Sequence, residues 1–281
     1  QIEQKLSQPE YLPQALFDKF NIEVLSTTDS AISDLSQHIE INNSNWDGRI
    51  IPTYRPDSVI NPESHGFKNH LTKLGELTNE DTNSWDGYLT AHRSRRLFFK
   101  EMGATASDHG HPSARTENLS YKEAEQLFKR ILTEEFNAED ADQFRGQMLT
   151  EMAKMSCEDG LVMQIHPAPN RNHSKGIWNK FGVDAGFDIP GRTDYVHAMK
   201  PLLDEVGLRT DITIVLFTLD ETSYSRELAP MAGVYPALKL GPPWWFLDSY
   251  EGMKRFREST IETCGFYNTV GFNDDTRAFC S

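Results

Sequence analysis

Short apolar runs recur along the chain, and each is bounded by polar or turn-forming residues. The runs have the length of buried strands and carry branched or aromatic side chains, most clearly in LVMQIHP at 161–167 and ITIVLFTLD at 212–220. The run ATASDHG at 104–110 has the weakest strand propensity. The pattern predicts seven strands, at 22–29, 49–57, 104–110, 161–167, 212–220, 237–243 and 267–275.

Amphipathic stretches that are too long and too polar to be strands separate these runs. They predict helices at 84–102, 120–135, 138–157, 192–206 and 249–264. Strands that alternate with helices are typical of βαβ units and a parallel sheet. Two stretches interrupt the alternation: residues 112–141 predict a helical insertion, and residues 170–191 predict a long irregular loop.

Polar residues of chemical interest end nearly every predicted strand, as in TTD, YRPD, SDHG, QIH, TLD and NDD. A (β/α)8 barrel carries its active site at the carboxyl ends of its strands, whereas a doubly wound sheet concentrates such residues at one switch point. The pattern therefore predicts an α/β protein, a (β/α)8 TIM barrel in one domain over residues 1–281, with the loop at 170–191 over its mouth. Seven strands are one short of closure.

Composition excludes several classes of partner. A formal net charge of −14 argues against a nucleic-acid-binding surface and against adhesion to anionic membranes. No apolar run approaches the ~20 residues that span a bilayer, and the polar amino terminus does not resemble a secretory signal. Three cysteines form no CxxC pair. We therefore expect a cytoplasmic enzyme of small metabolites, without nucleic-acid or membrane partners; association into a homo-oligomer stays open.

The strongest local cluster is GFNDDTR at 271–277. A carboxylate such as Asp275 at a strand end can bind a metal or act as a base. The guanidinium of Arg277, two residues later, matches a substrate carboxylate in a bidentate pair. The alternative, an Asx-turn with an exposed salt bridge, is equally compatible with this spacing.

Histidines follow two further strands. His166 leaves an apolar strand for a loop, where it can ligate a metal or move a proton, although a lone histidine is more often structural. His109 and His111 are two residues apart, so on a strand they share one face, a known arrangement of metal ligands. Because Gly110 and Pro112 indicate a turn, we expect at most one of the two to face the barrel axis.

Arginine and tryptophan complete the set of candidate ligand contacts. Arg55 ends the second predicted strand, and Arg171 lies just beyond His166; a salt bridge is the structural alternative for both. Trp244 and Trp245 follow Gly-Pro-Pro, where an aromatic face can stack on a sugar or exclude water. We expect one of the two to pack the barrel rim instead.

Several chemistries lose support because their motifs are missing. The sequence contains no Gly-rich phosphate loop, no GxSxG elbow and no HExxH. No cysteine has a histidine partner at a recognisable spacing. The remaining candidate is acid–base or metal-assisted chemistry on a small anionic ligand.

Long stretches of the chain resemble uronate isomerase, a family of the amidohydrolase superfamily. The resemblance covers essentially all 281 residues in order, and is carried by 95–110, 148–166, 217–230, 241–246 and 265–279. It implies the (β/α)8 fold and a divalent metal, with zinc as the expected ion. It also implies interconversion of the hexuronates D-glucuronate and D-fructuronate, and of D-galacturonate and D-tagaturonate, by proton transfer through an enediol.

The resemblance also implies roles for individual residues. Asp275 matches the aspartate of the last strand, which binds the metal and takes part in proton transfer, and Arg277 matches a substrate-contacting arginine. Arg55 matches the arginine of the family's RPD run, also a substrate contact. Trp244 or Trp245 matches an active-site tryptophan. His166 aligns with a histidine that the superfamily uses as a metal ligand. Arg171 and His109 are expected substrate contacts because of their positions beside predicted strand ends, not because of the resemblance.

One departure from the family stands out. The family's first strand carries an H-x-H pair of metal ligands, and this sequence has no such pair before its first predicted strand. We therefore expect the chain to start after that strand and to stop before the family's last helices. Two alternatives stay open: a metal-dependent hydrolase on the same barrel, and a catalytically incomplete chain that only binds.

Overall fold

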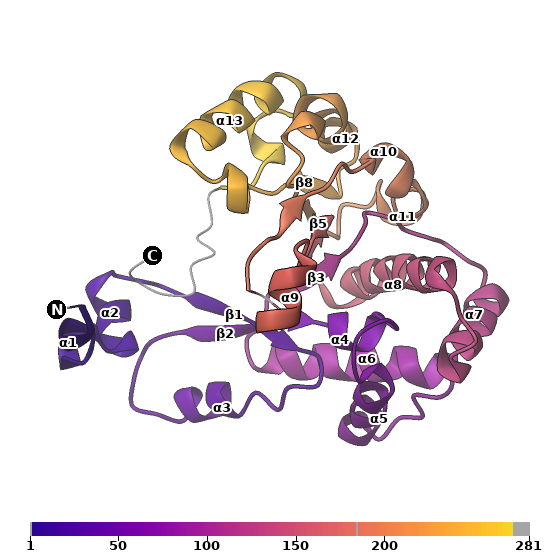
Figure 1. Cartoon of the computed structure of the whole chain (residues 1–281), viewed down its shortest axis with the longest axis horizontal. Coiled ribbons are helices and arrows are strands. Elements are labelled where there is room, and N and C mark those ends of the chain that lie inside the picture. The colour runs from indigo at the N-terminus through magenta and orange to yellow at the C-terminus, as the bar shows by residue number, and fades with distance from the viewer. Residues whose placement is uncertain (1, 184, 272–281) are drawn as a thin grey trace.

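A parallel sheet forms the centre of the protein (Figure 1). The structure, a computed structural model, describes residues 2–183 and 185–271. Six parallel strands follow one another in the order β1-β2-β3-β4-β7-β8. Their bounds are Leu25–Ser30 (β1), Ile50–Arg55 (β2), Ala106–His111 (β3), Val162–Pro167 (β4), Ile214–Leu216 (β7) and Leu238–Leu240 (β8).

The strand order confirms the predicted fold class. Each strand of this sheet lies beside the one that follows it in the sheet's chain order, and helices connect them, which is the winding of a (β/α) barrel. A doubly wound sheet would reverse its order at a switch point. All six strands overlap six of the predicted runs, and β1 and β3 each extend one residue beyond theirs. Of the seventh, 267–275, Thr269 forms a parallel bridge to Leu240, and its residues from 272 lie outside the described part of the chain.

Helices cover the outer side of the sheet (Figure 1). Those longer than ten residues are α5 (Phe67–Thr78), α6 (Trp85–Glu101), α7 (Tyr121–Thr133), α8 (Ala138–Asp159) and α13 (Tyr250–Cys264). The shorter α-helices are α1 (Ile2–Leu6), α2 (Pro13–Lys19), α3 (Ser36–Asn42), α4 (Asp57–Ile60), α9 (Lys175–Phe181), α10 (Tyr195–Ala198), α11 (Lys200–Val206) and α12 (Ala229–Val234). Single turns are η1 (Pro9–Tyr11), η2 (Glu221–Ser223), η3 (Tyr224–Leu228), η4 (Trp245–Leu247) and η5 (Phe266–Asn268).

Local sequence explains where the long helices begin and end. Ser120 and Asn137 form capping boxes with residues three positions on, which start α7 and α8. Ser84 and Ser249 accept a backbone N–H at the starts of α6 and α13. These boundaries agree within two residues with the predicted helices, whereas the predicted helix at 192–206 is split into α10 and α11.

The two faces of the sheet differ in chemistry, because successive side chains of a strand point to opposite sides. On the helix side, Tyr54 packs edge-on against Phe99 of α6, with ring centroids 5.1 Å apart, and Ile165 and Ile214 are fully buried. Burial of each large apolar side chain in this layer stabilises the fold by about 1.5–3 kcal/mol. The opposite face carries polar side chains and a small separate apolar cluster around Phe217.

The two predicted insertions contain regular structure. Residues 112–141 include α7. Residues 170–191, predicted as an irregular loop, instead hold α9 between β5 (Pro169–Asn170) and β6 (Ile189–Pro190), which pair antiparallel. We refer to residues 169–190 as the hairpin segment. The sequence did not reveal the strands because each is only two residues long.

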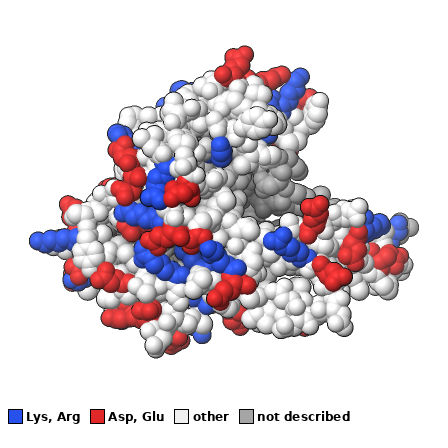
Figure 2. All heavy atoms as spheres, turned by 180° about the vertical axis from the view of Figure 1, so that it is seen from behind, with Lys and Arg blue, Asp and Glu red and all other residues white. Residues whose placement is uncertain are grey.

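The surface carries both signs of charge. Figure 2 shows Lys and Arg side chains intermingled with Asp and Glu side chains on the face seen from behind Figure 1. Among the described residues, no helix combines the length and the apolar character that a membrane span requires.

A buried histidine makes the stability of the fold depend on pH. His92 of α6 is fully buried, and its Nδ1 lies 2.7 Å from the hydroxyl of Tyr54. Burial, reinforced by the charges of Arg96 and Arg93, lowers the pKa of His92 to about 3. An unfolded chain protonates this group near its ordinary pKa of about 6.5, so stability falls as pH drops below that value.

We predict that His92 contributes about 2 kcal/mol to the loss of unfolding free energy between pH 7.5 and pH 5.0. The His92→Phe variant should be less stable at every pH, because Tyr54 loses its partner, but should show a correspondingly smaller loss on acidification. Urea unfolding at both pH values measures the difference. His197→Gln is the control, since the side chain of His197 is 85% exposed. An unchanged pH dependence in His92→Phe would contradict the prediction.

Candidate functional site

The carboxyl ends of three adjacent strands bring Arg55, Asp108 and His166 together. Arg55 ends β2, Asp108 lies in β3 and His166 lies near the end of β4. Nη1 of Arg55 donates to Oδ2 of Asp108 at 2.9 Å, and Nδ1 of His166 lies 2.6 Å from Oδ1 of the same carboxylate. The single carboxylate of Asp108 therefore joins a cationic side chain to an imidazole.

A second carboxylate holds Arg55 from the other side. Nε of Arg55 donates to Oδ2 of Asp57 at 2.7 Å, and the backbone N–H of Gly110 donates to both oxygens of Asp57 at 3.2 Å. A side chain at 110 would displace this pair: a Cβ there would lie 2.2 Å from Nη2 of Arg55 and 2.9 Å from Oδ2 of Asp57. The guanidinium is thus fixed, while 32% of the Arg55 side chain stays exposed.

Aromatic rings fix the plane of His166. The ring of Phe217 stacks on it at 4.0 Å between centroids and 18° between planes, and Trp244 meets it edge-on at 4.7 Å. Phe217 can approach this closely because position 241 is glycine; a Cβ there would lie 2.6 Å from the Phe217 ring. The side chains of Phe217 and Trp244 are buried, so one wall of the site is apolar.

Asp108 is ionised at neutral pH. Its burial alone would raise the pKa, but the hydrogen bond and charge of His166 and the charge of Arg55 outweigh this effect and lower the pKa to about 2. A carboxylate that is ionised and 6% exposed needs such partners, because an unpaired buried charge is costly.

Of the residues predicted from sequence, the structure brings Arg55, His166 and Trp244 together. Arg171 lies on the hairpin segment, where its Nη1 is 3.5 Å from Oδ2 of Asp188. Asp275 and Arg277 lie outside the described residues. Trp245 begins η4. Three of the eight residues predicted for the site therefore lie together in the described part of the chain.

His109 turns away from these residues. It lies on the face of β3 that carries Ser107, whose neighbour in β2 is Tyr54, and this face packs against the helices. His109 is fully buried there, and its Nε2 lies 3.1 Å from the hydroxyl of Ser107. Burial, together with the nearby His111, lowers the pKa of His109 well below its ordinary value. We expected a turn at Gly110, but β3 continues through His111, so His109 and His111 share one face, and that face is the helix side.

Sequence reasoning missed Asp108 and Phe217. The alternation of side chains along a strand narrows the choice for β3. Asp108 and His109 are adjacent, so only one of them can share the face of Arg55 and His166. In the observed register, Asp108 lies opposite Gln164 and Gly110 opposite His166. Identifying Asp108 from sequence required the register between β3 and β4.

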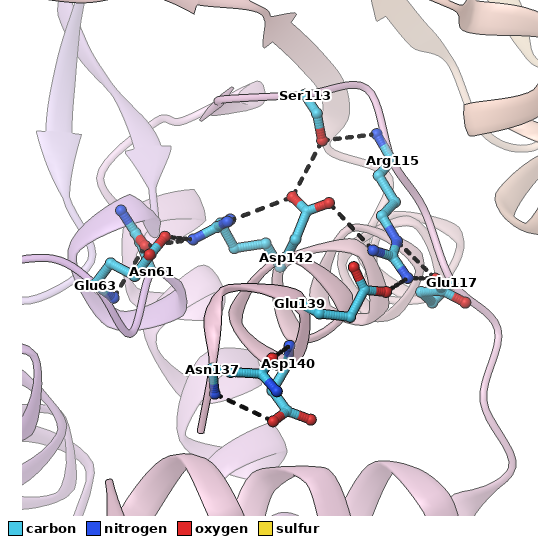
Figure 3. A network of polar contacts seen from close by, with 10 residues as sticks. Asn61, Glu63, Ser113, Arg115, Glu117, Asn137, Glu139, Asp140 and Asp142 are labelled. Atoms are coloured by element: carbon cyan, nitrogen blue, oxygen red, sulfur yellow. Dashed lines mark hydrogen bonds and ion pairs between the residues drawn. The ribbon is translucent and has the colours of Figure 1, made fainter. Parts of the chain in front are cut away.

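A polar network next to the site ties together the segments that follow β2 and β3 (Figure 3). Arg145 of α8 donates to Asn61 at 2.9 Å and to Glu63 at 2.6 Å, both of which follow α4. Asp142 of α8 accepts from Ser113 at 3.2 Å and from Arg115 at 3.3 Å. One turn of α8 thereby anchors two of the segments whose strands carry Arg55 and Asp108.

The described residues do not by themselves form a metal site. Within 2–183 and 185–271, no group of three His, Cys, Asp or Glu side chains is placed to hold an ion. His166 presents one imidazole nitrogen, Nε2, that makes no hydrogen bond within this part of the chain. An imidazole suits several divalent transition metals, so His166 fits the role of one ligand among others.

Comparison with known proteins agrees with this architecture. The model of the glucuronate isomerase family matches residues 1–281. The chain is 64% identical over 276 residues to the uronate isomerase of Rhizobium meliloti (strain 1021), covering 98% of this chain and 59% of that protein. It is 63% identical to the uronate isomerase of Mesorhizobium japonicum, covering 96% of this chain and 58% of that protein. The chain thus spans slightly less than three fifths of these relatives.

Solved structures show the same relationship in three dimensions. The glucuronate isomerase of Caulobacter crescentus superposes with a TM-score of 0.96 at 56% identity, over 99% of this chain and 58% of that one. The uronate isomerase of Thermotoga maritima superposes with a TM-score of 0.91 at 29% identity, over 99% of this chain and 61% of that one. Since the family model covers the chain from its first residue to its last, this protein belongs to the glucuronate isomerase family.

Proposed function

We propose that this chain forms the substrate-binding edge of a uronate isomerase. The reaction is the conversion of D-glucuronate to D-fructuronate, and of D-galacturonate to D-tagaturonate, by proton transfer between C2 and C1 through an enediol. The observation that carries the proposal is the fixed guanidinium of Arg55 beside His166 at the carboxyl edge of the sheet. This edge is where barrel enzymes place their chemistry.

Arg55 would hold the substrate carboxylate. Its planar fork suits a bidentate pair, and about a third of the side chain stays accessible although two carboxylates fix its position. Arg171, on the hairpin segment, would supply a second contact, and Arg277 a third. Phe217 and Trp244 would exclude water from one side of the sugar and so strengthen these charged contacts.

The balance of charge favours a bound cation. Among the described residues, Arg55 carries one positive charge and contacts two acidic side chains: the ionised Asp108, and Asp57, whose pKa is raised by burial. An anionic substrate bound here would gain from further positive charge. Arg277 and a divalent cation, for which we propose zinc, would supply that charge. His166 and Asp275 are the proposed ligands from this chain. When bound, the cation polarises the carbonyl and hydroxyl oxygens of the substrate.

Asp275 would also move the proton. A base placed beside C2 takes its proton and returns it to C1, and such positioned groups are typically worth ~10²–10⁴-fold in rate.

A single domain over residues 1–281, a cytoplasmic location and association into a homo-oligomer belong to the same proposal.

A chimera tests the activity directly. Residues 1–281 would replace the matching part of the Rhizobium meliloti uronate isomerase, which is 64% identical over 276 residues. We expect the chimera to convert D-glucuronate to a keto-uronate, and the Asp275→Asn chimera to lose at least ~10²-fold in kcat. The reaction can be followed by NMR of the sugar, with the unmodified Rhizobium protein alongside. An inactive chimera beside an active parent protein would refute the proposal. Turnover of a uronate lactone instead would establish a hydrolase.

We predict that Arg55→Lys raises KM for D-glucuronate by ~10–100-fold in the chimera, with a smaller effect on kcat. Lysine keeps the charge but loses the bidentate fork that the carboxylate would meet. Arg93→Lys is the matched control: Arg93 makes two hydrogen bonds to Glu158, at 2.7 and 2.8 Å, on the exposed surface. Steady-state kinetics on both variants measure the effect, and equal KM values would remove Arg55 from the substrate site.

We predict that Gly110→Ala impairs the same step without replacing a charged residue. The added Cβ would displace the end of Arg55, and a misplacement of about 1 Å can cost roughly 10²-fold in rate. Gly176→Ala in α9 is the control, because a Cβ there has no neighbour within 4 Å. Kinetics at saturating and limiting substrate should show a lower kcat/KM, with a raised KM, for Gly110→Ala alone; if the two variants match, the close approach of Gly110 to Arg55 has no functional role.

A further inference from the structure

The two carboxylate oxygens of Asp108 have different partners, and this difference identifies which nitrogen of His166 carries the proton. Oδ2 accepts from Arg55 at 2.9 Å, and Oδ1 faces Nδ1 of His166 at 2.6 Å. Because an ionised carboxylate can only accept hydrogen bonds, Nδ1 of His166 must be the donor. In a neutral imidazole the lone pair then belongs to Nε2.

The ring of His166 cannot readily turn to exchange its two nitrogens. Phe217 stacks on one face at 4.0 Å, and Trp244 meets the ring edge-on at 4.7 Å. Gly241 leaves the space in which Phe217 stacks. Within the described residues Nε2 makes no hydrogen bond, and 16% of the His166 side chain remains exposed.

We infer that Asp108 is a positioning residue that holds His166 as the Nδ1–H tautomer, so that the Nε2 lone pair is available at the substrate-binding edge. Nε2 can then accept a proton from a substrate hydroxyl or donate its lone pair to a cation. Asp108 itself acts through His166 and through Arg55, whose guanidinium it orients with the same carboxylate. The consequence for turnover rests on the proposed function; the tautomer does not.

An isosteric variant separates tautomer from shape. In Asp108→Asn, Arg55 can only donate, so the amide oxygen is expected to turn to Arg55 and the amide NH2 to His166. Nδ1 must then accept, and the proton moves to Nε2. Asp57→Asn is the matched control, because Asp57 also binds Arg55 but makes no contact with His166 in the described structure.

The tautomer is measured by long-range ¹H–¹⁵N NMR of the 281-residue chain with labelled histidine, recorded at pH 8 and assigned with His166→Gln. We expect the Nδ1–H pattern in the unmodified chain and in Asp57→Asn, and the Nε2–H pattern in Asp108→Asn. In the chimera, Asp108→Asn should lower kcat by ~10–100-fold, the range found when the partner that orients a functional histidine is removed.

Each outcome decides the inference. An Nε2–H tautomer or a doubly protonated ring in the unmodified chain overturns it, and so does an Asp108→Asn chain that keeps the Nδ1–H pattern. A flipped tautomer with unchanged kcat shows that Asp108 is merely structural. If the unmodified chimera is silent, the proposed isomerase function fails, and the NMR result alone still decides what Asp108 does to His166.

Discussion

The shared carboxylate of Asp108 is the interaction on which the site depends. It is buried and ionised, so it needs both of its partners, and those partners come from the strands on either side. One ion pair and one imidazole hydrogen bond therefore link the ends of β2, β3 and β4. Removing either partner would leave part of a buried charge unpaired, which favours keeping Arg55 and His166 in one arrangement.

The sheet makes this arrangement possible because each strand has one face toward the helices and the other toward the site. Its outer side chains, such as Tyr54 and Ile165, join the apolar layer under the helices. The intervening residues, such as Arg55 and His166, are thereby turned to the opposite face, where the small cluster of Phe217 and Trp244 is the apolar part. Packing on one side of the strand sets the position of the chemical groups on the other, since one backbone carries both.

The helix layer also holds the strand ends in place. Arg145 and Asp142 of α8 bind the segments that follow β2 and β3, so the loops beside Arg55 and Asp108 are tied to a helix of 22 residues (Figure 3). Close approaches at Gly110 and Gly241 then bring Arg55 and Phe217 into contact range. A site held by ion pairs, ring stacking and helix anchoring loses little conformational entropy when a ligand arrives.

Sequence by itself determined the order of the six sheet strands and of four long helices, the parallel winding and the strand-end positions of Arg55 and His166, because periodicity, capping residues and chain length are local properties. It could not decide which of Asp108 and His109 faces the site, nor that Phe217 stacks on His166. Those facts follow from the register between β3 and β4 and from the packing of β7, which are set by contacts between residues more than fifty positions apart. Only the tertiary structure decides which of the adjacent residues Asp108 and His109 faces the site and which faces the helices.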